Sequence, residues 1–399
     1  MRDWLADVFD GRPTWMNVLM VFCAYMTFVY VPWDFFVKPA AVDEEVWFGV
    51  MFTGWAAKLT TLAHWAIYAA GFYGFLRMRA WMFPWAAVYA GSVAIGMLVW
   101  PWAYRGSFLL GAVSFLPFAW LTRELWRAEP LFGAQRDSLR ERYGEWALVT
   151  GASAGIGAAF ARALAREGLS VVLTARRKDR LEALASELEK SFQVQTRVVE
   201  ENLANAEGAE RLARAVSDLP IGVLVNNAGF GGRGRFDSLQ AERLRDMVMV
   251  NCLAPLLLTR RILPRMQQEG RGAVIFTGSV SGRQPLPLHA AYAATKAFDQ
   301  LLGEALYVEG RAHGVDVLVV EPGSTETEFQ EVAREIAHEG EAPETVVATA
   351  LDALGQQPSV VSGWYNWLRA NAAQRLAPRG LAAHWAHAIM RRETQEELR

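Results

Sequence analysis

The first third of the chain is almost free of charged side chains. Between Pro13 and Thr122 the sequence contains only nine Asp, Glu, Lys or Arg residues, whereas roughly a quarter of the residues in a soluble domain are charged. Twelve of the sixteen tryptophans also precede position 130. A segment this apolar is poorly suited to water, so we expect it to lie in a lipid bilayer.

The apolar residues of this segment form four stretches, at about 15–33, 50–76, 84–103 and 106–122. A bilayer core needs about 20 apolar residues per helix and tolerates about 17. We therefore predict an all-α transmembrane domain of about four helices within residues 1–130. Because the last stretch is short, three spans and a re-entrant segment are an alternative.

Basic residues are unevenly distributed between the two ends of these stretches. Arginines precede the first stretch, join the second to the third and follow the fourth, whereas the opposite loops hold Lys38 among acidic residues and a lone Arg105. The positive-inside rule then predicts a multi-pass protein whose following domain faces the cytoplasm. Lysine is scarce beside arginine, which points to a GC-rich bacterial genome, and we therefore expect the membrane to be a bacterial inner membrane. The arginines on the predicted cytoplasmic side are Arg2, Arg12, Arg77, Arg79, Arg123 and Arg127.

Three ionisable residues, Asp34, Lys58 and His64, lie in or near the predicted spans. Ionisable groups are costly in lipid and therefore face a protein interior, a cavity or a partner. We expect Lys58 to snorkel or to pack with Asp34, and a proton or ion pathway is the alternative.

The sequence pattern changes after the apolar segment. Residues 131–144 are charged and are interpreted as a linker, after which short Val- and Leu-rich runs alternate with helical patterns. Such runs are typical of a parallel sheet covered on both faces. We predict a Rossmann-like, doubly wound α/β domain over 145–365 and a C-terminal helical extension over 366–399. The runs are 146–150, 170–174, 222–227, 273–278 and 315–323.

The overall charge and the cysteines exclude two classes of function. Forty basic and 42 acidic residues give a formal charge of −2, and nucleic-acid binding as a main role would need a concentrated basic face. Cys23 and Cys252 have no metal-ligand spacing and cannot form a disulfide framework. We therefore expect neither nucleic acid nor a metal site.

The sequence TGASAGIG (150–157) directly follows the first predicted strand and opens a helix. Gly151 permits a tight turn, Gly155 lets the backbone approach a pyrophosphate, and Gly157 lets the helix pack on the sheet. The helix N-terminus offers unpaired N–H groups to the phosphates. This context predicts a dinucleotide site, with an ordinary strand-to-helix turn as the alternative.

The end of the second predicted strand bears on the choice of cofactor. It reads TARRKDRL (174–181), with Arg176 and Arg177 and no acid at the strand end. An acid there would hold a bare ribose, whereas arginine suits a 2′-phosphate. We therefore favour NADP(H) over NAD(H), and solvated charges at a helix start are the alternative.

Five motifs over roughly 145–365 resemble those of the short-chain dehydrogenase/reductase family and occur in family order. One departure is Asn202, where the family commonly has an Asp near the adenine. The resemblance implies an oxidoreductase of the carbonyl reductase or alcohol dehydrogenase type that forms a dimer or tetramer. The motifs are TGASAGIG, NNAG (226–229), Ser279 thirteen residues before Tyr292, YAATK (292–296) and EPGSTET (321–327).

Tyr292 and Lys296 lie four residues apart on a predicted helix, so their side chains share one face. A free tyrosine has a pKa of about 10, and an adjacent ammonium should lower it so that the phenol can exchange a proton with substrate. By resemblance, Ser279 hydrogen-bonds the substrate oxygen, Lys296 holds the nicotinamide ribose and Asn251 supports a proton-relay water. Ser281 is an alternative to Ser279, and a structural asparagine is the alternative for Asn251.

The resemblance also implies which residues hold the cofactor. Part of the set would lie against the ribose and part in a loop that closes over the nicotinamide. His289, just before the catalytic helix, is expected to be exposed, and a substrate contact is the alternative. The predicted cofactor-binding residues are Gly151, Ser153, Gly155, Ile156, Gly157, Arg176, Arg177, Asn202, Leu203, Asn226, Ala228, Gly229, Tyr292, Lys296, Pro322, Gly323, Thr325 and Thr327.

The C-terminal stretch 363–392 mixes tryptophans, among them Trp364, Trp367 and Trp385, with several arginines. Such a stretch could lie on the membrane surface beside a substrate entrance. An ordinary lid or subunit-contact helix is an equally good interpretation.

The two parts of the chain together predict a membrane-anchored, NADPH-dependent reductase that transfers hydride to a ketone or 3-oxo group of a lipophilic, lipid-like substrate. By resemblance, the candidates are a 3-oxoacyl thioester, a 3-keto sphingoid base or a sterol-like ketone. The alternative is an NADP(H)-binding redox sensor or membrane scaffold with little turnover. The Ser279–Tyr292–Lys296 set argues against a sensor, because a sensor needs no proton donor.

Overall fold

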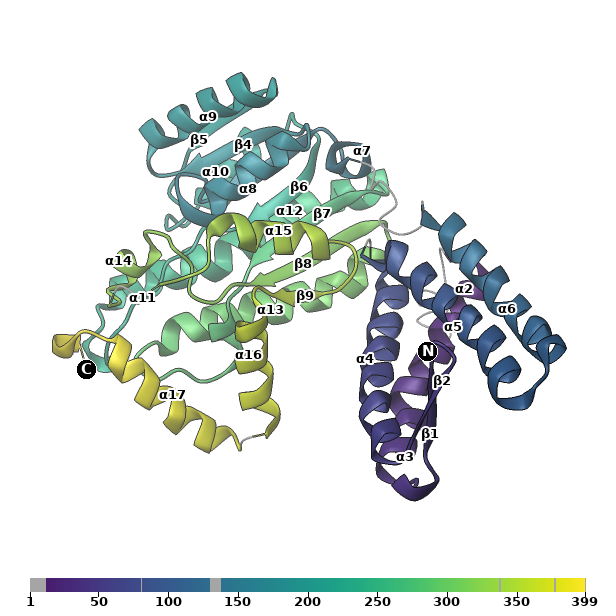
Figure 1. Ribbon diagram of the computed structural model, residues 1–399. Coiled ribbons are helices and arrows are strands. Elements are labelled where there is room, and N and C mark those ends of the chain that lie inside the picture. Colours follow the sequence, from purple (N-terminus) through teal and green to yellow (C-terminus); the bar gives the residue numbers. More distant parts are fainter. Residues whose placement is uncertain (1–11, 80, 130–137, 337–338, 377, 399) are drawn as a thin grey trace. The chain divides into compact units, whose positions relative to one another are not determined.

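The chain folds into two compact units, Met1–Arg136 and Asp137–Arg399 (Figure 1). The computed structural model describes residues 12–79, 81–129, 138–336, 339–376 and 378–398. Arg2 and the first half of the predicted linker, residues 131–137, lie outside the described residues. The rest of that linker forms the short helix α7 (Leu139–Tyr143), which begins with a capping box between Ser138 and Glu141.

The N-terminal unit consists mainly of long helices. The first is a continuous helical run over Thr14–Phe36 that contains one π-helical segment, η1 (Met26–Tyr30). The N-terminal unit contains α2 (Thr14–Tyr25), α3 (Val31–Phe36), α4 (Trp55–Arg77), α5 (Met82–Arg105) and α6 (Phe108–Arg127).

Within the described residues, four helical segments are long and apolar enough to cross a membrane: Thr14–Phe36, Met82–Tyr104, Phe108–Arg127 and Ala241–Glu269. The first three match the first, third and fourth predicted stretches. The fourth belongs to the second unit, where it packs against the sheet. The second predicted stretch forms α4, which has 23 residues but is made less apolar by its lysine, histidine and threonines.

The predicted span 50–76 is wrong at its start, where the chain forms a hairpin. Strands β1 (Glu44–Trp47) and β2 (Val50–Thr53) pair antiparallel through a turn at Gly49. Gly49 has φ +85°, and a Cβ at this position would lie 2.7 Å from the side chain of Val99. The last predicted stretch, in contrast, forms the uninterrupted 20-residue helix α6. This helix is long enough to cross a membrane, which favours a fourth span over a re-entrant segment.

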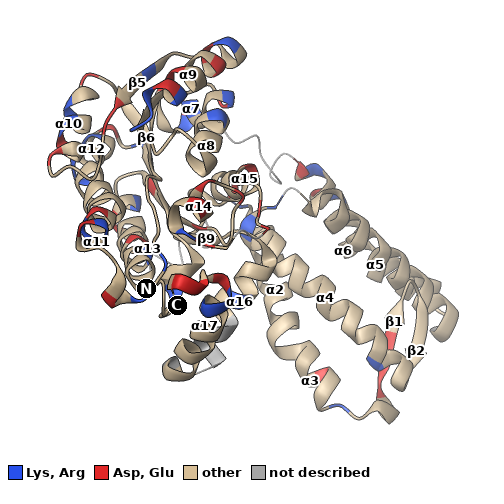
Figure 2. Cartoon of the chain, turned by 90° about the vertical axis from the view of Figure 1, so that its left-hand side faces the viewer, with Lys and Arg blue, Asp and Glu red and all other residues tan. Residues whose placement is uncertain are grey.

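The N-terminal unit exposes apolar side chains and buries charged ones. Leu109 is 76% exposed and Trp55 is also 76% exposed, whereas Lys58 is only 4% exposed and Asp34 and Asp43 are still less accessible. Figure 2 shows few charged residues on these helices compared with the second unit. This inversion is expected where the surrounding solvent is hydrocarbon, and the chain is accordingly a membrane protein.

The buried charges of this unit form an ionic network near the hairpin. Lys58 donates to the main-chain oxygen of Asp34 and pairs with Asp43, with 3.1 Å between its Nζ and Oδ2. Lys38 Nζ bridges Asp43 at 2.6 Å and Asp34 at 3.3 Å. Lys58 therefore packs with Asp34, which was the favoured expectation.

His64 lies apart from this network and pairs with Glu45 of β1. Its ring stacks on Trp47, with ring centroids 4.0 Å apart. The hairpin therefore supplies the polar partner and the stacking partner for the histidine of α4.

The second unit is built on a seven-stranded, all-parallel sheet in the order β5-β4-β3-β6-β7-β8-β9. This order reverses direction between β3 and β6, as in a doubly wound Rossmann-like sheet. The fold class predicted for this part of the chain is confirmed. The strands are β3 (Trp146–Thr150), β4 (Ser170–Ala175), β5 (Thr196–Glu200), β6 (Ile221–Asn226), β7 (Gly272–Thr277), β8 (Val315–Glu321) and β9 (Ser359–Val361).

Helices cover both faces of this sheet and enclose two apolar cores. Neighbouring residues of β3 contribute to different cores, because side chains alternate along a strand: Ala147 and Val149 face one and Leu148 the other. One face carries α8 (Gly155–Arg166), α9 (Lys178–Phe192) and α15 (Pro343–Ala353). The other carries α10 (Gly208–Ala215), α12 (Ala254–Glu269) and α13 (Ala290–Arg311).

Two more helices follow the sheet, α16 (Trp364–Leu376) and α17 (Arg379–Glu393). The predicted boundary between 365 and 366 falls inside α16. The predicted extension begins two residues after α16 does.

Candidate active site

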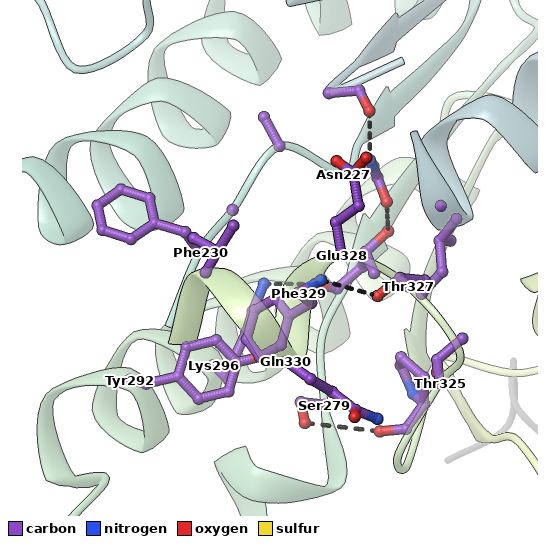
Figure 3. Close-up of a pocket in the computed structure, with 18 of the residues that line it drawn as sticks. Asn227, Phe230, Ser279, Tyr292, Lys296, Thr325, Thr327, Glu328, Phe329 and Gln330 are labelled. Atoms are coloured by element: carbon purple, nitrogen blue, oxygen red, sulfur yellow. Dashed lines mark hydrogen bonds between the residues drawn. The ribbon is translucent and has the colours of Figure 1, made fainter. Parts of the chain in front are cut away.

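A cavity of about 960 Å³ lies at the carboxyl ends of the strands, where open α/β sheets bind their ligands. Most of the predicted site residues line it, and Figure 3 shows Ser279, Tyr292 and Lys296 together, with Asn227 farther along. Three predicted residues do not line it: Gly157, Asn226 and Asn251. The lining set is Gly151, Ser153, Gly155, Ile156, Arg176, Arg177, Asn202, Leu203, Ala228, Gly229, Ser279, Tyr292, Lys296, Pro322, Gly323, Thr325 and Thr327.

The glycine turn between β3 and α8 needs its glycines for close approach. Gly151 has φ +68°, and a Cβ there would lie 2.9 Å from Ala228 Cα. A Cβ on Gly157 would lie 2.3 Å from the oxygen of Gly151, so this glycine packs the helix onto the turn. Ala154 at the N-cap gives no side-chain cap, so the first N–H groups of α8 remain suited to an anionic ligand.

The two predicted 2′-phosphate ligands differ in their surroundings. Arg177 donates to Ser153 Oγ at 3.0 Å and pairs with Glu328 at 2.7 Å. Arg176 is exposed, lines the cavity and has no ion-pair partner among the described residues. Arg176 is therefore the guanidinium left open to a ligand at the end of β4.

Asn202 uses its side chain locally, since its Oδ1 accepts a hydrogen bond from the Ala204 N–H at 3.1 Å. The adjacent Leu203 is buried and also lines the cavity. This turn contributes an apolar wall and an amide at the position where the family commonly has an acid.

The asparagine pair at the end of β6 differs from the prediction. The side chain of Asn226 is buried and donates to Thr259 of α12 at 3.0 Å. It is Asn227 that lines the cavity, donating through Nδ2 to the Thr150 oxygen at 2.9 Å. Strand alternation turns the last residue of β6 toward α12 and the following residue toward the cavity, and only the exact strand end decides between them.

Tyr292 and Lys296 project from α13 toward Ser279, which follows β7. Lys296 Nζ lies 5.9 Å from the centroid of the Tyr292 ring and donates to the Thr277 oxygen at 2.6 Å. The Ser279 hydroxyl donates to the Pro322 oxygen at 3.5 Å and accepts from the Ser281 N–H at 3.1 Å. Ser281 thus orients Ser279 through its backbone.

The pKa of Tyr292 is raised, contrary to the expected direction. Burial is the largest cause, and the charge of Lys296 and a hydrogen bond with Ser279 act in the opposite direction. The sequence correctly indicated the effect of the ammonium, but it could not weigh the loss of water around the phenol. The phenol is therefore held in its proton-bearing form.

Asp299 is a site residue that sequence reasoning missed. It lies one turn after Lys296, with 3.1 Å between Oδ2 and Nζ, and it is buried. Burial acts to lower the pKa of Lys296, but Asp299 and Tyr292 outweigh it, so that pKa lies above its ordinary value. The available signal was an acid three residues after the lysine on one helix face.

Asn251 lies in a π-helical segment, η5 (Met249–Leu253), between α11 (Ala241–Val248) and α12. Its Oδ1 accepts from the Phe230 N–H at 3.1 Å, and its Nδ2 donates to the Phe230 oxygen and to Thr295 Oγ1, both at 3.0 Å. The amide therefore ties the loop after β6 to α13, one residue before Lys296. Short π-helical segments of this kind are frequent at functional sites.

The loop after β8 packs against Tyr292 and the glycine turn. Phe329, which starts the short helix α14 (Phe329–Ala333), lies against Tyr292 with ring centroids 5.2 Å apart (Figure 3). Thr327 contacts the glycine turn: a Cβ on Gly155 would lie 2.8 Å from Thr327 Cγ2. The sequence indicated the loop, but not that its phenylalanine shields the tyrosine from solvent.

His289 is buried, whereas we expected it to be exposed. Its ring meets Tyr292 edge to face, with centroids 4.6 Å apart, and its Nδ1 has no hydrogen-bond partner among the described residues. Burial lowers the pKa of His289 to about 3, with Arg233 acting in the same direction. The imidazole is therefore neutral at physiological pH and forms part of the cavity wall beside the phenol.

Comparison with known proteins identifies a family and a relative that this chain resembles. The model of the short chain dehydrogenase family matches residues 145–337. Very-long-chain 3-oxoacyl-CoA reductase of Homo sapiens is 32% identical over 269 residues, which are 66% of this chain and 83% of that protein.

Solved structures give the same result for the α/β unit. A 7beta-hydroxysteroid dehydrogenase shares 30% identity at a TM-score of 0.59, covering 62% of this chain and 99% of that one. A short-chain dehydrogenase from Sphingobium yanoikuyae in complex with NADPH shares 33% identity at a TM-score of 0.53, covering 57% and 91%.

Proposed function

The chain belongs to the short-chain dehydrogenase/reductase family, and on that premise we propose that it reduces the 3-oxo group of a long-chain acyl thioester with NADPH at a membrane. The observation that carries the proposal is the placement of Ser279, Tyr292 and Lys296 at one end of a dinucleotide-sized cavity. The same chain contains helices able to cross a bilayer, and a very long acyl chain is itself lipid-like.

The cavity residues fit a phosphorylated dinucleotide. The uncapped start of α8 suits a pyrophosphate, and Arg176 stands open at the strand end where a 2′-phosphate would lie. The S. yanoikuyae relative is known with NADPH, which supports the same cofactor here. When bound, NADPH supplies the hydride.

The side chains of the site supply the proton and the positioning. Tyr292 Oη, held protonated by burial, donates a proton to the carbonyl oxygen as it becomes an alcohol. Ser279 donates a hydrogen bond to that oxygen and stabilises the negative charge that develops on it. Lys296 carries a positive charge that stabilises the phenolate left behind.

Asn251 and Phe329 support this step without reacting. Through its three hydrogen bonds, Asn251 fixes the end of the loop after β6 against α13. Phe329 excludes water from the phenol. A dry site strengthens the electrostatic contribution of Lys296 and Ser279.

The membrane orientation is also part of the proposal. Arg12 donates to the Phe75 and Leu76 oxygens in the last turn of α4, at 2.9 and 3.0 Å, so the predicted cytoplasmic arginines of these two segments lie at one end of the N-terminal unit. Positive-inside counting then places the α/β unit in the cytoplasm, where NADPH is made. We propose that this membrane is a bacterial inner membrane.

A homo-oligomer is proposed as well, following the family resemblance. Helices α12 and α13 carry exposed apolar side chains, among them Leu256, Leu301 and Val308. Such side chains on the surface of a water-facing unit are suited to subunit contact.

The proposal is tested with the full chain reconstituted in liposomes. Oxidation of NADPH is followed with 3-oxoacyl thioesters of increasing chain length, a 3-keto sphingoid base and a sterol-like ketone. We expect turnover with the long thioesters and a fall of about 100-fold or more in Tyr292→Phe, because a general acid is lost. NADPH binding, measured by fluorescence, should survive in this variant.

The two serines provide a matched control. Ser279→Ala should lose most of the activity, whereas Ser281→Ala, which keeps the backbone N–H that orients Ser279, should keep it. Normal turnover in Tyr292→Phe would rule out the proposed reaction. A signal that depends on bound NADPH but not on Tyr292 would favour the sensor instead.

A further inference from the structure

Helix α17 carries apolar residues on two faces, and one of them packs on the catalytic helix. Ala382, Ala386 and Met390 recur every four residues and are buried. Ala386 and Met390 pack in one cluster with Leu286 and Ala293 near the start of α13. This face therefore fixes α17 to the wall of the active site.

The second apolar face of α17 is about half exposed among the described residues of its unit. Leu381, Trp385 and Ile389 also recur every four residues, so they lie in line along the helix, and Trp385 is 55% exposed. Helix α16 adds further exposed apolar and aromatic side chains. Large exposed apolar surfaces on a folded unit mark an interaction site. The α16 residues are Trp364, Tyr365, Trp367 and Leu368.

The charged residues of this segment are almost all basic. Residues 364–392 contain five arginines and neither Asp nor Glu, although acids and bases nearly balance in the whole chain. Arg369, Arg391 and Arg392 are exposed. Tryptophan and tyrosine prefer the headgroup level of a bilayer, and exposed arginine is attracted to anionic lipids.

The same two helices also line the active-site cavity. Tyr365, Asn366 and Arg369 of α16 and Met390 and Glu393 of α17 contribute to its wall. The exposed aromatic surface is thus continuous with the rim of the cavity in which Tyr292 lies.

We propose that α16 and α17 form a docking surface for the headgroup region of an anionic bilayer, so that the cavity opens beside lipid. A second copy of the chain fits this surface less well, because a two-fold contact would place the arginine-rich face against itself. The N-terminal unit keeps the α/β unit at a membrane in any case. Given the proposed function, docking would let a lipid-like ketone enter the cavity without crossing water.

The test uses the full chain in liposomes, with Cys23 and Cys252 replaced by Ala and a fluorophore placed at Ile389→Cys. A nitroxide-labelled lipid reports contact with the bilayer, and aqueous iodide reports contact with water. The matched control carries the fluorophore at Phe236→Cys, on a residue of the same unit that is 65% exposed and outside the cavity.

We expect lipid quenching at position 389 in vesicles containing phosphatidylglycerol, and much less at position 236. The double variant Arg391→Glu/Arg392→Glu should weaken docking about thirtyfold, since each surface arginine contributes to binding anionic lipid. Vesicles of phosphatidylcholine alone should weaken it as well.

Three results would overturn the proposal. Iodide quenching without lipid quenching at 389 would place the helix in water. Protection from both quenchers would mean that protein covers this face, either a second copy or the N-terminal unit. Lipid quenching that is equal at 236 and 389, or unchanged in the double variant, would mean that α17 has no specific contact. None of these readouts needs turnover, so failure of the proposed reaction would be recognised separately.

Discussion

The two units of this protein place the same kinds of residue in opposite positions. In the N-terminal unit Leu109 is 76% exposed and Lys58 is buried, whereas in the α/β unit Leu148 is fully buried and Lys178 lies at the surface. The difference follows from the solvent. In hydrocarbon, apolar side chains gain no hydrophobic free energy by being buried. Residue type therefore predicts burial only after the surroundings of a segment have been inferred.

The α/β unit also buries ionisable side chains, and several of them lie near the cavity. Lys296, Asp299 and His289 are all buried within contact of Tyr292 or of each other. Buried ionisable side chains thus lie at a helix-hairpin junction in one unit and around the Tyr292 phenol in the other.

The strongest test of this contrast removes one buried charge from the lipid-facing unit. Lys58→Met leaves Asp43 short of one cation and the Asp34 oxygen without its donor. Stability in detergent, measured by denaturant titration, should fall by about 3–5 kcal/mol, the usual cost of breaking a buried pair. The surface pair Lys178–Glu182 gives the control: Lys178→Met should cost less than about 1 kcal/mol. Equal costs would show that the burial of these charges has no energetic weight.

A second test concerns close packing between helices. In lipid, helices associate without a hydrophobic driving force, so close packing has to hold them together. A Cβ on Gly111 of α6 would lie 2.5 Å from the Leu98 oxygen of α5. Gly111→Ala should therefore cost about 2 kcal/mol through overpacking. Gly91→Ala, whose Cβ would lie 3.5 Å from Thr122 in the same helix pair, should be tolerated. Similar melting temperatures for the two variants would contradict the close α5–α6 contact.

A third test asks when an exposed charge of the α/β unit matters. Arg176 is solvent-exposed, and its loss should leave stability unchanged. The ratio of NADPH affinity to NADH affinity, measured by fluorescence titration, should nevertheless fall about tenfold in Arg176→Ala. The variant loses a charge-assisted contact to the 2′-phosphate, which only NADPH carries. Lys178→Ala, two residues further along but outside the cavity lining, should leave the ratio unchanged. Equal affinities of the native chain for the two cofactors would refute the 2′-phosphate assignment.

The smallest expected effect belongs to the buried pair in the α/β unit. Asp299 acts to raise the pKa of Tyr292, and Lys296 acts to lower it. Asp299→Asn removes the raising effect, so the pKa of the phenol should fall and reduction should lose its proton donor at a lower pH than in the native chain. The pH profile of kcat reports this shift. An unchanged profile would show that Asp299 serves folding alone, and a profile that moves toward higher pH would contradict the direction of its effect.

The sequence predicted the strands of the sheet interior well and those at its edges poorly. The five runs that were recognised are buried on both faces and so read as continuous apolar segments. β5 mixes Thr196 and Arg197 with two valines, and β9 has only three residues. Both lie at sheet edges, where one side is open to water and the apolar signal is weak.

The site was predicted where chemistry dictates the residue type and missed where geometry does. The glycine turn, Ser279, Tyr292 and Lys296 were recognised from their motifs and line the cavity. The choice between Asn226 and Asn227 depends on where β6 ends. The burial of His289 depends on the whole fold, which brings Glu335 to 4.0 Å from its Nδ1. The raised pKa of Tyr292 has the same origin, because burial belongs to the whole fold.

The π-helical segment Met249–Leu253 places a constraint on how this enzyme can change over evolutionary time. Successive residues of an α-helix are rotated by roughly 100°, so deletion of any one of these five residues would turn all of α11 relative to α12. The carboxamide of Asn251 would then swing off the loop it holds. Insertions and deletions should be far rarer in this segment than amino-acid exchanges at its outward positions.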